Sequence, residues 1–200
     1  MPYQDVLLKM SFYVSLVLIV PGPTNTLLLS SGLKVGLRGT WHLVIAEALG
    51  YIVAISLWGF FLCALAETRP WLYGAAKLVS SIYIFCLALK MWSKSRILQD
   101  QEIGPVSFRD MFVATLMNPK GLLFASVLFP IQAFQSSGYF LRALVVFLIV
   151  LTPIGVGWSC LGGLLTSQRS WAAHTTTLLR GASLVLLMFS VTLVYSLIKT

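Results

Sequence analysis

Charged side chains are scarce in this sequence. Only 10% of the 200 residues are Asp, Glu, Lys or Arg, and just six of these are acidic against fourteen basic. A soluble domain carries about a quarter charged residues, so this chain has too few to cover a water-facing surface. The shortage excludes an ordinary soluble globular domain.

The signatures of enzymes and metal sites are missing as well. The sequence contains no P-loop, no HExxH and no GxSxG motif. No two of its three cysteines have CxxC spacing, and neither His42 nor His174 has a second ligand at metal spacing. We therefore expect no enzyme activity, no cofactor and no bound metal. Without an ATP site, any transport has to be secondary, driven by an ion gradient.

Apolar residues are what the chain has in quantity. They make up 58% of the sequence, and the mean hydropathy is +0.89. Runs long enough to cross about 30 Å of hydrocarbon recur along the chain. The first run has no small-residue cleavage site, so we interpret it as a retained span rather than a signal peptide. The predicted spans are 6–31, 41–65, 71–92, 109–134, 139–166 and 176–198.

The longest polar connection lies at 93–108, which we predict to be a cytoplasmic linker. It separates an N-terminal repeat of three spans, 1–92, from a C-terminal repeat of three spans, 109–200. An odd number of crossings turns the second repeat upside down relative to the first. The prediction is therefore an all-α integral membrane protein with six transmembrane helices in two inverted repeats. Secondary transporters of this design form their substrate site near the midplane, from broken helices at matching positions.

Basic residues gather at the ends of the apolar runs rather than on one amphipathic face. This distribution indicates contact with anionic lipid headgroups and gives no indication of nucleic-acid binding. The positive-inside rule assigns the side with more Lys and Arg to the cytoplasm, which predicts that both termini lie outside it. The count is eight, from Lys34, Arg38, Lys90, Lys94, Arg96, Arg109, Arg169 and Arg180, against four, from Lys9, Arg69, Arg142 and Lys199.

Each repeat opens with a span that is interrupted by proline and polar residues. A proline removes one backbone donor and clashes with the carbonyl four residues earlier, so Pro21 frees the carbonyl of Val17 and Pro119 that of Thr115. A freed carbonyl in hydrocarbon costs several kcal/mol unless protein or water satisfies it. We therefore predict a substrate site at the two breaks. Its residues are Pro21, Gly22, Pro23, Thr24, Asn25, Asn118, Pro119 and Lys120.

Charges inside the spans point to the same region. A charge at the centre of a membrane helix costs about 2.5–3.5 kcal/mol, and such residues usually face the bundle interior. Lys120 follows the second break directly, and Glu47 lies about 10 Å into the second span, with Tyr51 one turn on as a hydroxyl partner. Lys77 is a weaker candidate because it lies nearer a helix end. Glu47 either carries a proton or forms a structural ion pair, and the sequence leaves both readings open.

Two stretches carry a family resemblance. "PGPTNTLLLSSGLKVGLRG" in the first half and "NPKGLLFASVLFP" in the second resemble the LysE/RhtB family of lysine and homoserine/threonine exporters. The resemblance covers nearly the whole chain, with PGP and NPK as the motif residues of the two breaks. It implies a bacterial inner-membrane exporter of amino acids or close derivatives, driven by the proton motive force and able to form a homodimer. Glu47 departs from the apolar residue common in that family, which puts the substrate class in question.

Two other function classes fit parts of the sequence. Cys63 and Cys160 lie in the second spans of the two repeats, as a transmembrane thiol–disulfide carrier would require. Their neighbours are apolar, whereas redox cysteines normally lie near cations or helix N-termini. A non-transporting scaffold would explain six spans, but not two polar breaks and two charges inside the membrane.

Overall fold

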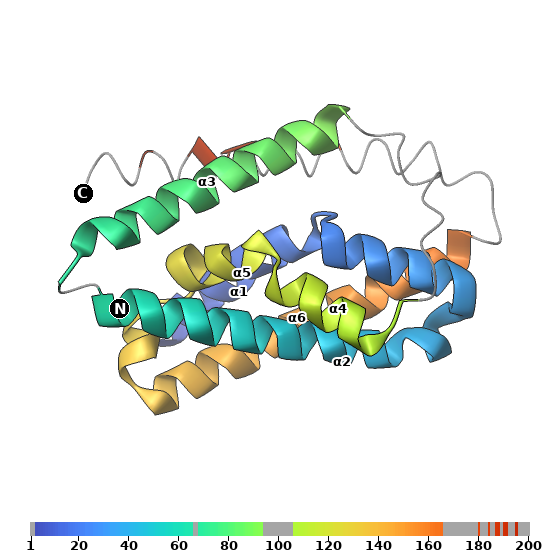
Figure 1. The fold of residues 1–200 in the computed structure, drawn as a ribbon, viewed down its shortest axis with the longest axis horizontal. Coiled ribbons are helices and arrows are strands. Elements are labelled where there is room, and N and C mark those ends of the chain that lie inside the picture. The colour runs from blue at the N-terminus through green and yellow to red at the C-terminus, as the bar shows by residue number, and fades with distance from the viewer. Residues whose placement is uncertain are drawn as a thin grey trace.

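The computed structural model describes residues 3–65, 68–93 and 106–165, together with positions 180, 184, 187, 188, 190, 191 and 195. All regular structure in this part of the chain is helical (Figure 1). The linker at 94–105 and most of the predicted sixth span, 176–198, lie outside the described residues. The elements are α1 (Tyr3–Ile19), α2 (Pro23–Leu65), α3 (Pro70–Ser93), α4 (Phe108–Leu116), α5 (Pro119–Leu123), the π-helical turn η1 (Phe124–Leu128), the 3-10 turn η2 (Ile131–Gln135) and α6 (Ser137–Leu165).

Helix α2 contains a reversal of the chain. Gly36 has φ 67°, a left-handed conformation that glycine adopts without a Cβ clash, and the helical geometry is interrupted there. Leu28 before the bend and Val44 after it both lie against Gly155 of α6. The two parts of α2, residues 23–35 and 37–65, therefore run side by side in opposite directions, as Figure 1 shows.

The helices are interrupted at both proline motifs. Helix α1 ends at Ile19 and α2 begins at Pro23, while α4 ends at Leu116 and α5 begins at Pro119. Proline suits a first helical position because its fixed φ is already helical and its missing N–H would have no partner there. Helices α4 and α5–η1 are bent by 47° at this break.

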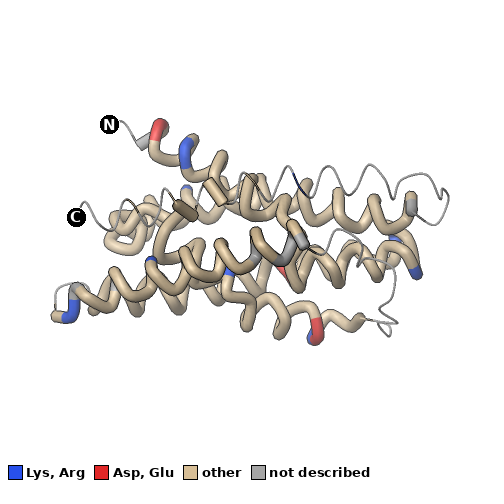
Figure 2. The backbone as a smooth tube through the Cα atoms, turned by 90° about the horizontal axis from the view of Figure 1, so that it is seen from above, with Lys and Arg blue, Asp and Glu red and all other residues tan. Residues whose placement is uncertain are grey.

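The described helices account for part of the expected membrane crossing. Helix α2, whose longer part follows the Gly36 bend, and helix α6 each contain a stretch long and apolar enough to span a bilayer, and the bent pair Phe108–Leu116 and Pro119–Leu128 would make a third span. Helix α3 holds a shorter apolar stretch, Gly74–Cys86. Lys and Arg lie mainly toward the two ends of the elongated bundle (Figure 2).

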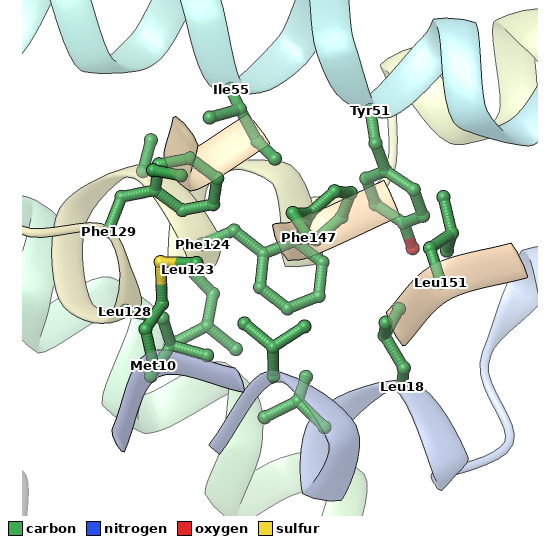
Figure 3. Packing of buried hydrophobic residues seen from close by; sticks show 14 of the residues in the cluster. Met10, Leu18, Tyr51, Ile55, Leu123, Phe124, Leu128, Phe129, Phe147 and Leu151 are labelled. Carbon is green, nitrogen blue, oxygen red and sulfur yellow. The ribbon is translucent and has the colours of Figure 1, made fainter. Parts of the chain in front are cut away.

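An aromatic core fills the bundle next to the second break. The rings of Tyr51, Phe124 and Phe147 meet edge to face, with centroids 5.1–5.8 Å apart. They come from α2, η1 and α6, and Leu18 of α1 belongs to the same cluster (Figure 3). The cluster holds α1, α2, η1 and α6 together around the two breaks.

Small residues let the helix backbones approach closely. A methyl group on Gly32 of α2 would overlap the carbonyl oxygen of Ser159 of α6, and one on Gly162 would overlap that of Leu29. In the part of α2 after the bend, Gly50 packs against Thr115 of α4. Close approach at small residues is the usual way that helices associate in membranes.

Candidate functional site

Lys120 joins the two breaks. Its side chain is fully buried, and its Nζ donates hydrogen bonds to the carbonyl oxygens of Val17 at 3.0 Å and Val20 at 2.8 Å. Val17 is the residue whose carbonyl Pro21 frees. A cation at the start of α5 therefore satisfies the carbonyls that end α1.

Asn25 completes the same end of α1. Its Nδ2 donates to the carbonyl oxygens of Leu18 at 2.7 Å and Val20 at 2.8 Å, and its side chain is 2% exposed. Two side chains of the protein, Lys120 and Asn25, therefore bind the carbonyls at the end of α1.

Asn118 fixes the second break. Its Oδ1 accepts a hydrogen bond from the Lys120 backbone N–H at 3.1 Å, and its Nδ2 donates to the Tyr51 hydroxyl at 3.1 Å. The carbonyl of Thr115, freed by Pro119, accepts from the Asn118 backbone N–H at 3.0 Å. Tyr51 thus binds Asn118, and the hydrogen bond expected between Tyr51 and Glu47 is not formed in the described structure.

Glu47 is the unusual member of the site. Its side chain is fully buried, and neither carboxylate oxygen has a hydrogen-bond partner among the described residues. The Thr24 hydroxyl is near the Glu47 carboxylate, but the two groups do not form a hydrogen bond. Lys120 is close enough to interact with the carboxylate electrostatically. No described salt bridge joins the two charges. An acidic group this deep in apolar surroundings needs a proton or a cationic partner.

A comparison with protein families identifies the chain. The sequence model of the LysE type translocator family matches residues 15–197. The chain belongs to the LysE type translocator family. Comparison with curated proteins and with solved structures gave no match. The protein is accordingly a multi-pass membrane translocator, and membership of a transporter family agrees with the expectation that it is not an enzyme.

The other residues expected in the site of this LysE type translocator differ in their placement. Gly22 is buried beside Lys120, and a methyl group on it would lie 3.2 Å from the lysine Nζ. Pro21 is partly buried, whereas Pro23 and Pro119 are exposed. Lys77 is only partly buried, on α3, in contrast to the fully buried Lys120 and Glu47.

Sequence reasoning missed the contribution of α6. A methyl group on Gly155 would lie 3.1 Å from Glu47 Oε2, so this glycine forms one wall beside the carboxylate. One turn on, the Ser159 hydroxyl is fully buried and has no hydrogen-bond partner in the described structure. The available signal was the small-residue spacing of Gly155, Ser159 and Gly162, which marks a closely packed helix face.

Proposed function

We propose that this translocator is a secondary exporter of amino acids or close derivatives, driven by the proton motive force across the bacterial inner membrane. The observation that supports this most strongly is that a buried lysine, Lys120, lies near a buried glutamate, Glu47, which has no hydrogen-bond partner among the described residues, where two broken helices meet. Charged side chains inside a membrane bundle are energetically costly and usually have a functional role.

The two charges suit the two ends of a zwitterion. An ammonium group has three N–H donors, and two of those on Lys120 bind Val17 and Val20. The third would bind the substrate carboxylate. The substrate amino group would approach Glu47, whose oxygens lack a partner among the described residues.

Glu47 would also provide the coupling to protons. In its ionised form it binds the ammonium of the substrate, and protonation removes that attraction. Exchange of a proton for a substrate cation at one carboxylate gives antiport, because the carboxylate serves either one or the other. This proposal keeps Glu47 as a proton carrier and departs from the reading of a permanent ion pair.

The broken helices also support the proposed repeat architecture. In each half a helix stops, a proline begins the next helical segment, and an asparagine near the break makes side-chain hydrogen bonds to the backbone. We propose six spans in two inverted repeats, 1–92 and 109–200, with both termini outside the cytoplasm. The chain could also associate as a homodimer through its exposed apolar faces.

The thiol–disulfide alternative has less support. Because Glu47 contacts Gly155 and the later part of α2 runs antiparallel to α6, Cys63 and Cys160 lie toward opposite ends of the bundle. The helical rise puts them about 30 Å apart along it. Both cysteines are free, and a direct exchange between them would not occur at that separation.

Reconstituted vesicles test the proposal. Proteoliposomes preloaded with a panel of amino acids should release one chemical class faster when a pH gradient is imposed. Lys120→Met and Pro23→Ala should lose this release, since one removes the carboxylate partner and the other alters the break that positions it. A protein that is folded and inserted but moves no amino acid under either condition would refute the proposed function.

A further inference from the structure

Four buried oxygen-bearing side chains along α2 and α6 lack hydrogen-bond partners in the described part of the chain. They are Thr24, Ser31, Glu47 and Ser159, and none is more than 6% exposed. Buried polar groups are almost always hydrogen-bonded. Where no protein group is the partner, an internal water molecule usually makes the hydrogen bond. Four such residues on two packed helices therefore need one common explanation.

The four residues follow one direction through the bundle. Thr24 and Ser31 are seven residues apart on α2, which places them on one face at a separation of about 10 Å. Ser159 lies one turn beyond Gly155 on α6, where its backbone packs against Gly32. Since Gly155 is the glycine beside Glu47, both serines lie nearer than Glu47 to the Gly36 bend.

The second part of α2 adds one more hydroxyl at the far end. Thr40 is fully buried, seven residues before Glu47 on α2, and its hydroxyl donates to the carbonyl oxygens of Gly36 and Leu37. At the bend itself a methyl group on Gly36 would meet nothing within 4 Å. Buried hydroxyls thus occur at intervals between Glu47 and an open turn at one end of the molecule.

We propose that Thr24, Ser31 and Ser159, bridged by water, form the path along which the coupling proton moves between Glu47 and the Gly36 end. This inference rests on the proposed proton-coupled export. Each hydroxyl accepts a proton on its oxygen and passes on its own, so the chain is restored and the net result is one proton added to or removed from the Glu47 carboxylate. By the proposed orientation, the Gly36 end faces the cytoplasm.

The charges around Glu47 fit such a path. Among the described groups, Lys120 of α5 and Tyr51 of α2 are the titratable ones that interact with it, and Gly155 of α6 lies beside its carboxylate. Lys120 and Tyr51 lie on the side of the two breaks, where the substrate is proposed to bind. The hydroxyls lead away from them, so the proton and the substrate approach Glu47 from different directions.

The first test separates proton movement from substrate binding. The double variant Ser31→Ala/Ser159→Ala should lose about tenfold or more of the efflux driven by a pH gradient. It should retain exchange of labelled for unlabelled substrate at equal pH. Ser56→Ala is the matched control, because that hydroxyl donates to the Ile52 carbonyl within its own helix, and it should leave both rates unchanged.

The second test does not depend on transport. In a background with all three native cysteines replaced by alanine, Ser31→Cys and Ser159→Cys should react with a small charged thiol reagent added at the Gly36 side, and Ser56→Cys should not. Unreactive cysteines at 31 and 159, or full gradient-driven efflux in the double alanine variant, would overturn the path. If the wild-type protein shows no response to a pH gradient, the proposed function fails, and thiol reactivity alone then decides whether the path exists.

Discussion

The side chain of Asn25 should be essential for the stability of the first break. Asn25→Leu keeps a similar volume but removes both donors from the end of α1. Each lost hydrogen bond contributes about 0.5–1.5 kcal/mol, and a buried acceptor left without a partner costs about 1–3 kcal/mol. The carbonyl of Val20 keeps Lys120 as a donor at 2.8 Å, whereas the side-chain donor to Leu18 is lost. The free energy of unfolding should therefore fall by about 2–4 kcal/mol.

Titration of the purified protein with SDS in mixed micelles measures this difference. Ser56→Ala is the control, because its hydroxyl serves a carbonyl inside a continuous helix, and it should cost about 0.5 kcal/mol or less. If Asn25→Leu proved no less stable than Ser56→Ala, the carbonyls at the end of α1 would not depend on Asn25, and our account of the break would be wrong.

Three further substitutions probe the packing and the charge of the site. Gly155→Ala should slow transport by pressing a methyl group on the Glu47 carboxylate, whereas Gly157→Ala, which meets nothing within 4 Å, should transport as the wild type does. Gly162→Ala should lower stability by about 1–3 kcal/mol in the same SDS titration, since its methyl group overlaps the Leu29 carbonyl and forces α2 and α6 apart. Lys120→Met should lower the free energy of unfolding by about 3–5 kcal/mol, because it leaves Glu47 without a compensating charge. An unchanged unfolding midpoint would show that Glu47 does not need Lys120.

The sequence predicted the all-helical membrane architecture and the interruptions of the helices at both proline motifs. Pro23 follows Gly22, and Pro119 follows Asn118, and each of these combinations favours a helix break, whereas Pro153 lies inside the continuous helix α6. The burial of Lys120 and Glu47 was also predictable, because charged side chains in a membrane span almost always face the interior of the helix bundle. The reversal at Gly36 falls where the sequence already indicated a connection between two spans.

The partners within the site were not predictable in the same way. That Lys120 of one half binds the carbonyl of Val17 in the other depends on how the two halves pack, and no local pattern contains it. Tyr51 is one turn from Glu47 in sequence, yet its hydroxyl accepts from Asn118, 67 residues away. The unpartnered serines on α2 and α6 could be found only once the contact of Gly155 with Glu47 fixed the register of the two helices.

The measurement that most directly tests the central claim is the simultaneous flux of protons and amino acid in vesicles containing wild-type protein or Glu47→Gln. Glutamine keeps the shape of the side chain but cannot titrate. We predict that wild-type vesicles take up protons as they release substrate, and that Glu47→Gln abolishes the coupled proton movement. Proton-coupled release at the wild-type rate from Glu47→Gln would contradict the account.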